Sequence, residues 1–288
     1  MKMNISNKWI DYECLKTGNG EKLERWGNII LNRPDPQIIW EKKDVWNNYD
    51  GYYHRSNEGG GYWEYKKKLP EYWTVKYNNL TFKVSPTNFK HTGIFPEQAA
   101  NWDYIDFKVK EYLKDHEEMH ILNLFAYTGC ATMAAANAGA TEVVHVDASK
   151  SINEWAKENM KLCHLEDKTI RFIADDAIKF LEREKRRGHT YQGIIMDPPS
   201  YGRGPNKEVW KFENDFTKLL DKVKDVLDKD YSFLLISSYT TGISHISLEN
   251  ILKLKFPNQK IETGENCLPI TENNLILPCG IYGKITKN

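Results

Sequence analysis

The sequence predicts an α/β protein with a doubly wound, mostly parallel seven-stranded sheet and a small β-rich N-terminal domain. From about residue 120 onward, apolar runs of strand length alternate with helical patterns, as a parallel sheet with helical crossovers requires. The preceding part is rich in tryptophan and proline and holds two short alternating runs, 73–77 and 80–84. We therefore divide the chain into residues 1–95 and residues 96–288.

The elements of the larger domain follow from its apolar spacing. A helical pattern starts at Gln98 and leads into the first strand. The expected strands cover 120–126, 142–147, 169–174, 192–197 and 231–238. The expected helices cover 130–138, 149–163, 176–187 and 211–228. After them we expect a helix at 246–254 and a closing antiparallel hairpin made from 260–270 and 280–286.

Composition limits the class of protein. The 40 Lys and Arg residues balance 40 Asp and Glu residues, so a nucleic-acid surface would have to be a local patch. The apolar runs are short and interrupted and the start lacks an apolar signal core, so we expect no membrane helix and a cytoplasmic location. The five cysteines form no C-x-x-C pair, and we expect neither a disulfide framework nor a metal site.

The stretch 121–147 predicts a strand, a glycine turn, an Ala-rich helix and a second strand that ends in an acid. Its turn, Ala126-Tyr127-Thr128-Gly129, holds one glycine where a dinucleotide-binding turn needs three to approach a pyrophosphate. Asp147 follows about twenty residues later, the distance that ribose recognition requires. The expected ligand is therefore a nucleoside without phosphates.

Two further strands end in acids, Asp175-Asp176 after the third and Asp197 after the fourth. Ligands of open α/β sheets bind outside the carboxyl ends of the strands, so these acids should converge there. An acid after the third strand can accept a hydrogen bond from an adenine amino group, and only one of Asp175 and Asp176 can face the pocket. Each acid could instead cap a helix, but three acids in register with the glycine turn favour ligand binding.

Together these motifs resemble a class I S-adenosylmethionine-dependent methyltransferase, which has a Rossmann-like fold. Two stretches resemble the bacterial large-subunit (23S) rRNA methyltransferases of the cytosine-C5 and guanine-N7 type. Residues 92–98 read T-G-I-F-P-E-Q and match the segment T-G-x-F/Y-x-D/E-Q, while 197–201 read D-P-P-S-Y and match the D-P-P loop. The resemblance implies S-adenosyl-L-methionine as cofactor and RNA, 23S rRNA in particular, as partner. The family pattern also favours Asp176, which precedes Ala177, for the adenine role.

The motifs and the resemblance together give a set of expected cofactor contacts. In the family, the aromatic residue and Gln of the T-G-x-F segment lie against the adenosine and methionine parts. The small residues after the second and third strands can sandwich the adenine ring. The full set is Phe95, Gln98, Phe125, Tyr127, Thr128, Gly129, Asp147, Ala148, Asp176, Ala177 and Asp197.

The D-P-P loop indicates where the acceptor lies. Methyl transfer from a sulfonium is an in-line displacement, so the protein mainly aligns the acceptor and excludes water. The Asp197 carboxylate and the Pro198 carbonyl could orient a base amine or ring nitrogen, and Tyr201 offers a stacking face for an extruded base. The expected catalytic residues are Asp197, Pro198, Pro199 and Tyr201.

Carbon methylation makes a different demand. In the resembling C5 enzymes a cysteine after the fifth strand adds to the pyrimidine, and a thiolate is the competent nucleophile near neutral pH. Residues 236–240 read I-S-S-Y-T, so we expect nitrogen as the target. Two alternatives stay open: methylation of a small molecule or protein side chain, and a non-catalytic cofactor-binding protein that serves ribosome assembly. Whether the chain forms a homodimer also stays open.

One basic stretch of the N-terminal domain has two interpretations. Lys66-Lys67-Lys68 stands among the aromatic residues Trp63, Tyr65, Tyr72 and Trp73. This mixture of cations and rings is typical of proteins that bind single strands. Core aromatics of a small β domain would explain it almost as well.

Overall fold

The computed structural model describes residues 2–56, 60–88, 90–203, 209–240 and 242–287. The chain divides into two compact units. The α/β unit consists of residues 1–4, 101–265 and 280–288, and the N-terminal unit consists of residues 5–100 and 266–279. The division after Ala100 lies close to the boundary expected at residues 95 and 96, and the N-terminal unit also takes in a segment from near the C-terminus.

The α/β unit is built on a mixed sheet that has eight strands in the described part of the chain. The order across the sheet is β1-β16-β17-β15-β12-β9-β10-β11. The sequence predicted seven strands; the eighth is β1, a short N-terminal strand that pairs with β16. The strands are β1 (Met3–Ile5), β9 (His120–Leu124), β10 (Glu142–Asp147), β11 (Ile170–Ala174), β12 (Gly193–Met196), β15 (Phe233–Ser238), β16 (Lys260–Pro269) and β17 (Ile276–Thr286).

Pairing within this sheet follows the predicted doubly wound pattern. The run from β15 through β12, β9 and β10 to β11 is parallel throughout. β17 pairs antiparallel with β15, and β16 lies next to β17 as the expected closing hairpin. No helix in the described residues is long and apolar enough to cross a membrane.

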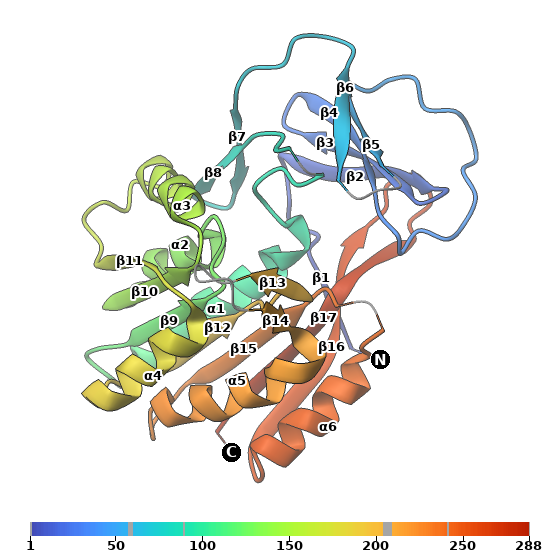
Figure 1. Cartoon of the computed structure of the whole chain (residues 1–288). Coiled ribbons are helices and arrows are strands. Elements are labelled where there is room, and N and C mark those ends of the chain that lie inside the picture. The colour runs from blue at the N-terminus through green and yellow to red at the C-terminus, as the bar shows by residue number, and fades with distance from the viewer. Residues whose placement is uncertain (1, 57–59, 89, 204–208, 241, 288) are drawn as a thin grey trace. The chain divides into compact units, whose positions relative to one another are not determined.

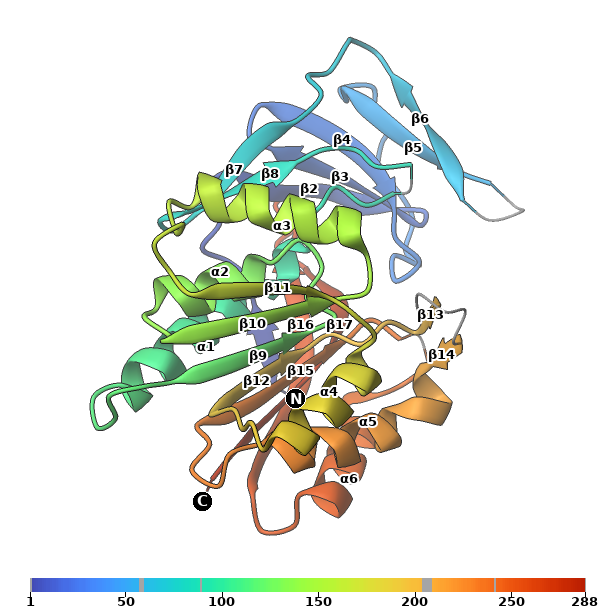
Figure 2. The ribbon, with the colours of Figure 1, turned by 60° about the vertical axis from the view of Figure 1, so that its left-hand side comes forward.

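Helices cover both faces of the sheet, with α1, α2 and α3 on one face and α4, α5 and α6 on the other (Figures 1 and 2). The helices are α1 (Ala99–Tyr112), α2 (Cys130–Asn137), α3 (Lys150–Leu162), α4 (Ala177–Arg187), α5 (Phe212–Val226) and α6 (His245–Lys255). Because the parallel strands are covered on both sides, they are apolar almost without interruption. β12 and β15 are buried at every position.

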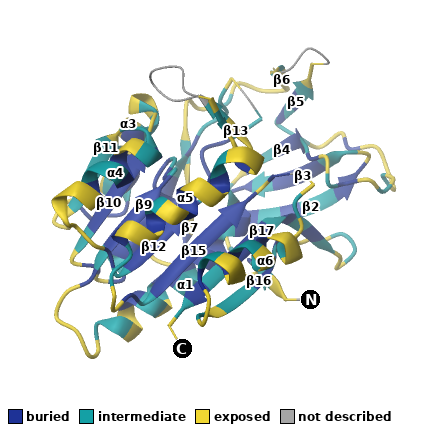
Figure 3. Ribbon diagram, turned by 60° about the horizontal axis from the view of Figure 1, so that its bottom comes forward, coloured by how far each residue is buried: buried dark blue, intermediate teal, exposed yellow. Residues whose placement is uncertain are grey.

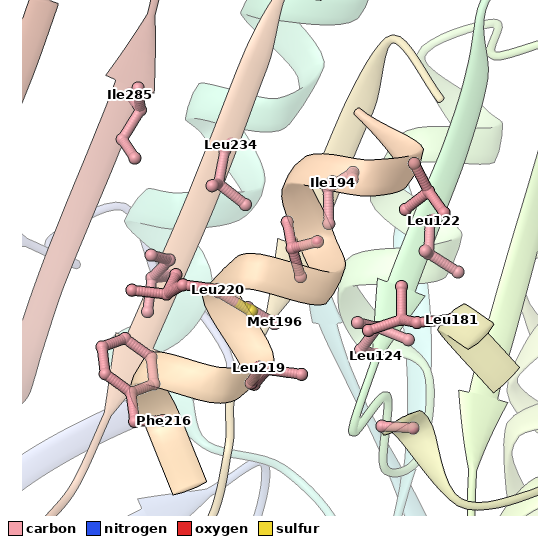
Figure 4. Close-up of a cluster of buried hydrophobic side chains, with 14 of the residues drawn as sticks. Leu122, Leu124, Leu181, Ile194, Met196, Phe216, Leu219, Leu220, Leu234 and Ile285 are labelled. Carbon is pink, nitrogen blue, oxygen red and sulfur yellow. The ribbon is translucent and has the colours of Figure 1, made fainter. Parts of the chain in front are cut away.

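The main core lies between the sheet and the helices α4 and α5 that cover one of its faces. Successive side chains of a strand point to opposite faces, so Leu122 and Leu124 of β9 share one face with Ile194 and Met196 of β12. Figure 4 shows these side chains against Leu219 and its neighbours from α5. The alternate positions of β9 and β10 face α2 and α3, and two of the buried residues there are polar: Asn123 and His145. Those two residues recur at the candidate site.

The N-terminal unit contains a five-stranded sheet and a two-stranded hairpin. Its larger sheet has the order β2-β3-β4-β5-β6, in which β4 and β5 are parallel and the other pairs are antiparallel. The predicted runs at 73–77 and 80–84 form the hairpin. The strands are β2 (Tyr12–Gly18), β3 (Glu21–Trp26), β4 (Ile29–Pro34), β5 (Gly51–Arg55), β6 (Gly61–Tyr65), β7 (Trp73–Tyr77) and β8 (Leu80–Val84).

Candidate cofactor and acceptor site

The strand order reverses at β9. From β9 the chain proceeds to β10 and β11 on one side, then returns to β12 and β15 on the other side. Ligands of open α/β sheets bind at this point, outside the carboxyl ends of the strands. The turn after β9, Asp147 at the end of β10 and Asp197 after β12 all belong to this edge of the sheet.

The turn after β9 has an unusual backbone. Phe125 and Tyr127 have φ of 54° and 50°, and Gly129 has φ of 82°. Non-glycine residues rarely adopt the left-handed region, and such positions cluster at binding sites. A Cβ on Gly129 would also lie 3.1 Å from the Cβ of Ala156 and 3.3 Å from the His145 ring. The positive φ therefore favours the single glycine of the motif, and the neighbouring side chains leave little room for a Cβ.

Asp147 fastens this turn to β10. Its Oδ2 accepts a hydrogen bond from the Tyr127 N–H at 3.0 Å, and its Oδ1 accepts one from the Ser149 N–H at 2.9 Å. Burial raises the pKa of Asp147 above its ordinary value, and the two backbone donors oppose that rise. Each carboxylate oxygen has two lone pairs, so the side chain keeps an acceptor on each oxygen for two neighbouring hydroxyls.

A buried chain of hydrogen bonds supports Asp147 from behind. Asn123 Nδ2 donates to Thr132 Oγ1 at 2.9 Å, and Thr132 Oγ1 lies 2.9 Å from His145 Nδ1. His145 Nε2 lies 3.2 Å from Asn153 Oδ1, and Asn153 Nδ2 donates to the Asp147 carbonyl at 3.4 Å. The four side chains are between 0 and 4% exposed. The chain thus connects β9, α2, β10 and α3 beneath the turn.

The direction of these bonds assigns the tautomer of His145. Because Asn153 Oδ1 can only accept, the proton of the neutral imidazole sits on Nε2. Nδ1 is then an acceptor, so the Thr132 hydroxyl, whose oxygen accepts from Asn123, donates its own proton to Nδ1. Burial lowers the pKa of His145 to about 4, which keeps the ring neutral at physiological pH.

We expect His145 to make the fold sensitive to acid. An unfolded histidine takes up a proton near pH 6.5, whereas folded His145 does so only near pH 4, so stability is lost as pH falls between these values. At pH 5 the loss from this one group is about 2 kcal/mol. In His145→Gln the amide can still donate to Asn153 and accept from Thr132, but it does not titrate.

Urea unfolding of both proteins at pH 7 and pH 5 measures this effect. The wild type should lose more unfolding free energy on acidification than the variant, while the titration of other groups, such as His91, cancels in the comparison. Equal losses in the two proteins would refute the assignment of a neutral, buried His145.

The acids after β11 have structural partners. Asp176 is the N-cap of α4, and its Oδ1 accepts a hydrogen bond from a backbone N–H of the first helical turn at 3.0 Å. Asp175 Oδ2 accepts from Arg183 Nη1 at 2.6 Å. Asp176 therefore fills the capping role that the sequence left open. Of the two small residues, Ala177 is buried and Ala148 exposed; their contact with adenine stays a prediction.

The D-P-P loop follows β12. Asp197 is partly buried, and desolvation raises the pKa of its carboxyl to about 6. Among the described residues none donates a hydrogen bond to its carboxylate. Pro198 is buried and Pro199 exposed, and the Pro199 carbonyl accepts a hydrogen bond from Trp210 Nε1 at 2.6 Å. The Trp210 ring also lies 5.5 Å from the ring of Phe125, so one indole joins the loop to the turn after β9.

The loop continues into a short hairpin of β13 (Tyr201–Arg203) and β14 (Val209–Lys211). Tyr201 begins β13 and is 52% exposed. Its backbone lies in register opposite Lys211 of β14. The role of Tyr201 as a stacking face for a base stays a prediction.

Hydroxyl groups occupy the region after β15. Thr240 Oγ1 accepts from Ser200 Oγ at 3.1 Å and from Ser238 Oγ at 3.0 Å. All five cysteines are buried with free thiols, and burial raises the pKa of Cys14 to about 12 and that of Cys130 further. A thiol with a raised pKa is a poor nucleophile. In the described residues no group of three or more His, Cys, Asp or Glu side chains is arranged to hold a metal ion.

Phe95 and Gln98 belong to the N-terminal unit. Phe95 precedes a 3-10 turn, η1 (Pro96–Gln98), whose carbonyl groups are held by side chains from the start of the chain. Trp9 Nε1 donates to the Pro96 carbonyl at 2.9 Å, and Ser6 Oγ donates to the next carbonyl at 2.7 Å. The turn is therefore fixed within its own unit, and its contact with a cofactor stays a prediction.

Sequence reasoning missed the residues that support the site. Trp210 belongs to no motif of the sequence. Asn123 and His145 do carry a signal, since each is a polar residue inside an apolar strand, and the two are register partners in neighbouring strands. Buried polar groups need hydrogen-bond partners, so such a pair indicates a network.

The strand order, the glycine turn and the acids at the carboxyl ends define a class I methyltransferase. The chain belongs to the S-adenosylmethionine-dependent methyltransferase family, whose model matches residues 53–250. A crystal structure of an S-adenosylmethionine-dependent methyltransferase from Agrobacterium tumefaciens is 33% identical and has a TM-score of 0.94, covering 100% of this chain and 94% of that one. A crystal structure of a methyltransferase complexed with SAH shares the fold at 20% sequence identity and a TM-score of 0.75. The match covers 97% of this chain and 76% of that chain.

Curated relatives carry a more specific name. The ribosomal RNA large subunit methyltransferase K/L of Syntrophotalea carbinolica is 26% identical over 75% of this chain and 30% of its own length. The K/L protein of Pseudoalteromonas atlantica is 34% identical over 54% of this chain and 20% of its own length. The chain thus spans less than a third of these relatives.

Proposed function

We propose that this protein methylates a base nitrogen of large-subunit ribosomal RNA. The observation that carries the proposal is the Asp197 carboxylate, which lies after β12 with no described donor and so has free acceptors for a base amine. The buried cysteines favour nitrogen over carbon. The names of the curated relatives support RNA of the large subunit as substrate.

The residues at the edge of the sheet fit the cofactor of the family. The two free lone pairs of Asp147 suit the vicinal hydroxyls of a ribose, because each oxygen can accept one more hydrogen bond. The turn 125–129 lacks the glycines that a pyrophosphate would need. Asp176 Oδ2 would accept from the adenine amino group, with Ala148 and Ala177 at the ring. Phe95 and Gln98 would cover the adenosine and methionine parts.

When bound, S-adenosylmethionine supplies an electrophilic methyl group on a sulfonium. The residues of the chain have three tasks toward the acceptor. The Asp197 carboxylate and the Pro198 carbonyl accept hydrogen bonds from the amine and direct its lone pair, Tyr201 stacks on the base, and Trp210 holds the loop that carries them. Alignment to within about 3 to 3.5 Å and exclusion of water are the main sources of rate in such a displacement.

Transfer of labelled methyl groups tests the proposal. Unmodified large-subunit rRNA should accept label in the presence of the protein, and mass mapping should locate it on a base. Label on protein or on small molecules of a cell extract, with none on RNA, would favour the first alternative. Cofactor binding without transfer to any of these would favour a role in ribosome assembly.

Nitrogen and carbon chemistry give different outcomes with a trapping substrate. We expect no covalent adduct on RNA with 5-fluoro-pyrimidine at the target, since each thiol is buried. Replacement of Cys130, Cys163, Cys267 or Cys279 by Ser or Ala should leave turnover unchanged. Denaturing electrophoresis detects an adduct as a shifted band. A shift that one cysteine variant abolishes would overturn the nitrogen assignment.

A further inference from the structure

The N-terminal unit carries a row of aromatic rings on an exposed edge. β6 is the edge strand of the five-stranded sheet, and within the described residues its strand partner is β5, beside which it lies in Figure 2. In β5, Gly51 and Tyr53 are buried, whereas Tyr52 and His54, which point to the other face, are partly exposed. Their partners across the pair, Glu64 and Tyr62, are both exposed. Figure 3 shows β6 with exposed positions at the top of the view.

The outward face of this strand pair carries aromatic residues where polar residues are common. The outward positions of an antiparallel pair are commonly polar. Here Tyr52, His54 and Tyr62 present rings, and Tyr62 is 63% exposed. Burial in the core does not account for them, since the inward positions of the same strands supply the buried Tyr53 and the half-buried Trp63.

The rings form a continuous row across the pair. We define the ring row as Tyr49, Tyr52, His54 and Tyr62. The centroids of neighbouring rings are 5.5, 3.9 and 5.0 Å apart, and the last pair is stacked with planes 21° apart. Lys66 Nζ lies 3.9 Å above the Tyr49 ring at one end. An exposed ring at the end of a stack leaves its free face open to a further π-system.

The charges around the ring row suit a polyanion with bases. The carboxylates of the face are engaged, Glu64 with His54 Nε2 at 2.7 Å and Glu21 with Lys42 and Tyr52. Exposed lysines follow β6 directly, and no described carboxylate pairs with Lys66 or Lys68. Cations beside stacking rings are the arrangement by which proteins hold single-stranded nucleic acid.

We propose that the ring row is a platform on which unpaired RNA bases stack, with Lys66 and Lys68 facing the phosphates. The proposal rests on RNA as the substrate and adds to it a second contact region within the N-terminal unit. A base stacks on the free face of Tyr62, and the backbone follows the lysines. Recognition by stacking tolerates any base, so the platform binds unpaired regions of the substrate without reading their sequence.

Fluorescence anisotropy with labelled RNA tests the platform. The probe is a single-stranded oligouridine of about 12 nucleotides. Tyr62→Ala should weaken binding about tenfold, whereas Tyr62→Phe, which keeps the ring, should bind like wild type. Lys66→Gln should reduce the salt dependence of log K by about one unit per decade of salt. Ile39→Ala, at a residue 90% exposed in the same unit, is the matched control and should change nothing.

The outcomes separate the platform from the proposed function. Weaker oligonucleotide binding by Tyr62→Ala, with a raised KM for RNA and unchanged kcat, supports the platform. If Tyr62→Ala binds the probe like wild type, the platform is wrong even when rRNA is methylated. If the probe is released by Tyr62→Ala but no RNA is ever methylated, the platform stands and the methylation proposal fails. Loss of a concentration-dependent dimer in Tyr62→Ala, with RNA affinity unchanged, would assign the face to a second copy and overturn the platform.

Discussion

Asp197→Ala should lower methyl transfer about a hundredfold or more while leaving the affinity for S-adenosylhomocysteine close to that of wild type. The carboxylate has no described hydrogen-bond donor within the protein, so its removal leaves no buried donor unpaired and the fold should persist. What is lost is the acceptor that fixes the direction of the amine. Because the chemical step depends on alignment, a displacement of about 1 Å is sufficient for this loss.

Single-turnover transfer and calorimetry measure the two quantities, and pH supplies an independent readout. The pKa of Asp197 is raised to about 6, so the wild-type carboxylate takes up a proton and loses an acceptor as pH falls through that value. Turnover should fall with it. In Asp197→Asn, which keeps one acceptor oxygen and does not titrate there, the residual rate should lack this step. An Asp197→Ala variant that turns over like wild type would remove Asp197 from the acceptor site.

The α/β unit could be predicted from the sequence because local and global signals agree there. Continuous apolar runs mark strands covered on both faces, and the intervening helices carry apolar residues at helical spacing. The predicted strand at 142–147 coincides with β10, and the predicted helix at 176–187 differs from α4 by its N-cap. Acids at strand ends were informative because parallel strands bring their carboxyl ends to one edge.

Other features depend on pairings that the sequence does not show. β1 is three residues long and is stabilised as a strand only by its place next to β16. β16 and β17 are each divided between the two units. The end of β16 and the start of β17 lie in the segment 266–279, which is grouped with residues 5–100. Contacts of such long sequence separation leave no periodic signal. The parallel pairing of β4 with β5 has the same cause, since a long irregular stretch separates the two strands.

The residues of the candidate site likewise fall into those that the sequence predicted and those that depend on the fold. Residues in motifs, such as Gly129 and Asp147, were predicted because their backbone conformation or their place at a strand end restricts the residue type. Trp210 was not, since it reaches Pro199 and Phe125 only through the fold of the hairpin β13–β14. The ring row is intermediate: the sequence shows the rings and lysines, but the pairing of β5 with β6 decides which rings share a face.

Asp147→Ala should weaken binding of S-adenosylhomocysteine by about 1 to 3 kcal/mol, that is, about five- to 150-fold. Two effects add. The ribose hydroxyls lose their acceptors, and the N–H groups of Tyr127 and Ser149 lose the carboxylate that holds the turn to β10. Asp147→Asn removes only part of these contacts, because its side chain keeps one of the two acceptor oxygens. That oxygen can still accept hydrogen bonds, whereas the amide nitrogen in place of the other oxygen cannot. Its affinity should lie between those of Ala and wild type.

Calorimetry with S-adenosylhomocysteine gives the dissociation constants, and urea unfolding without ligand gives the cost to the fold. His145→Gln is the matched control, since it leaves the Asp147 carboxylate in place and can keep both hydrogen bonds of the buried chain behind it; it should keep the affinity at pH 7. The deficit of Asp147→Ala should shrink when the ligand lacks its ribose hydroxyls, because a 2′,3′-dideoxy analogue has nothing to donate to the carboxylate and only the effect on the turn remains. A folded Asp147→Ala variant with wild-type affinity for S-adenosylhomocysteine would show that the ribose is held elsewhere, and the assignment of the β10 acid to the cofactor would fall with it.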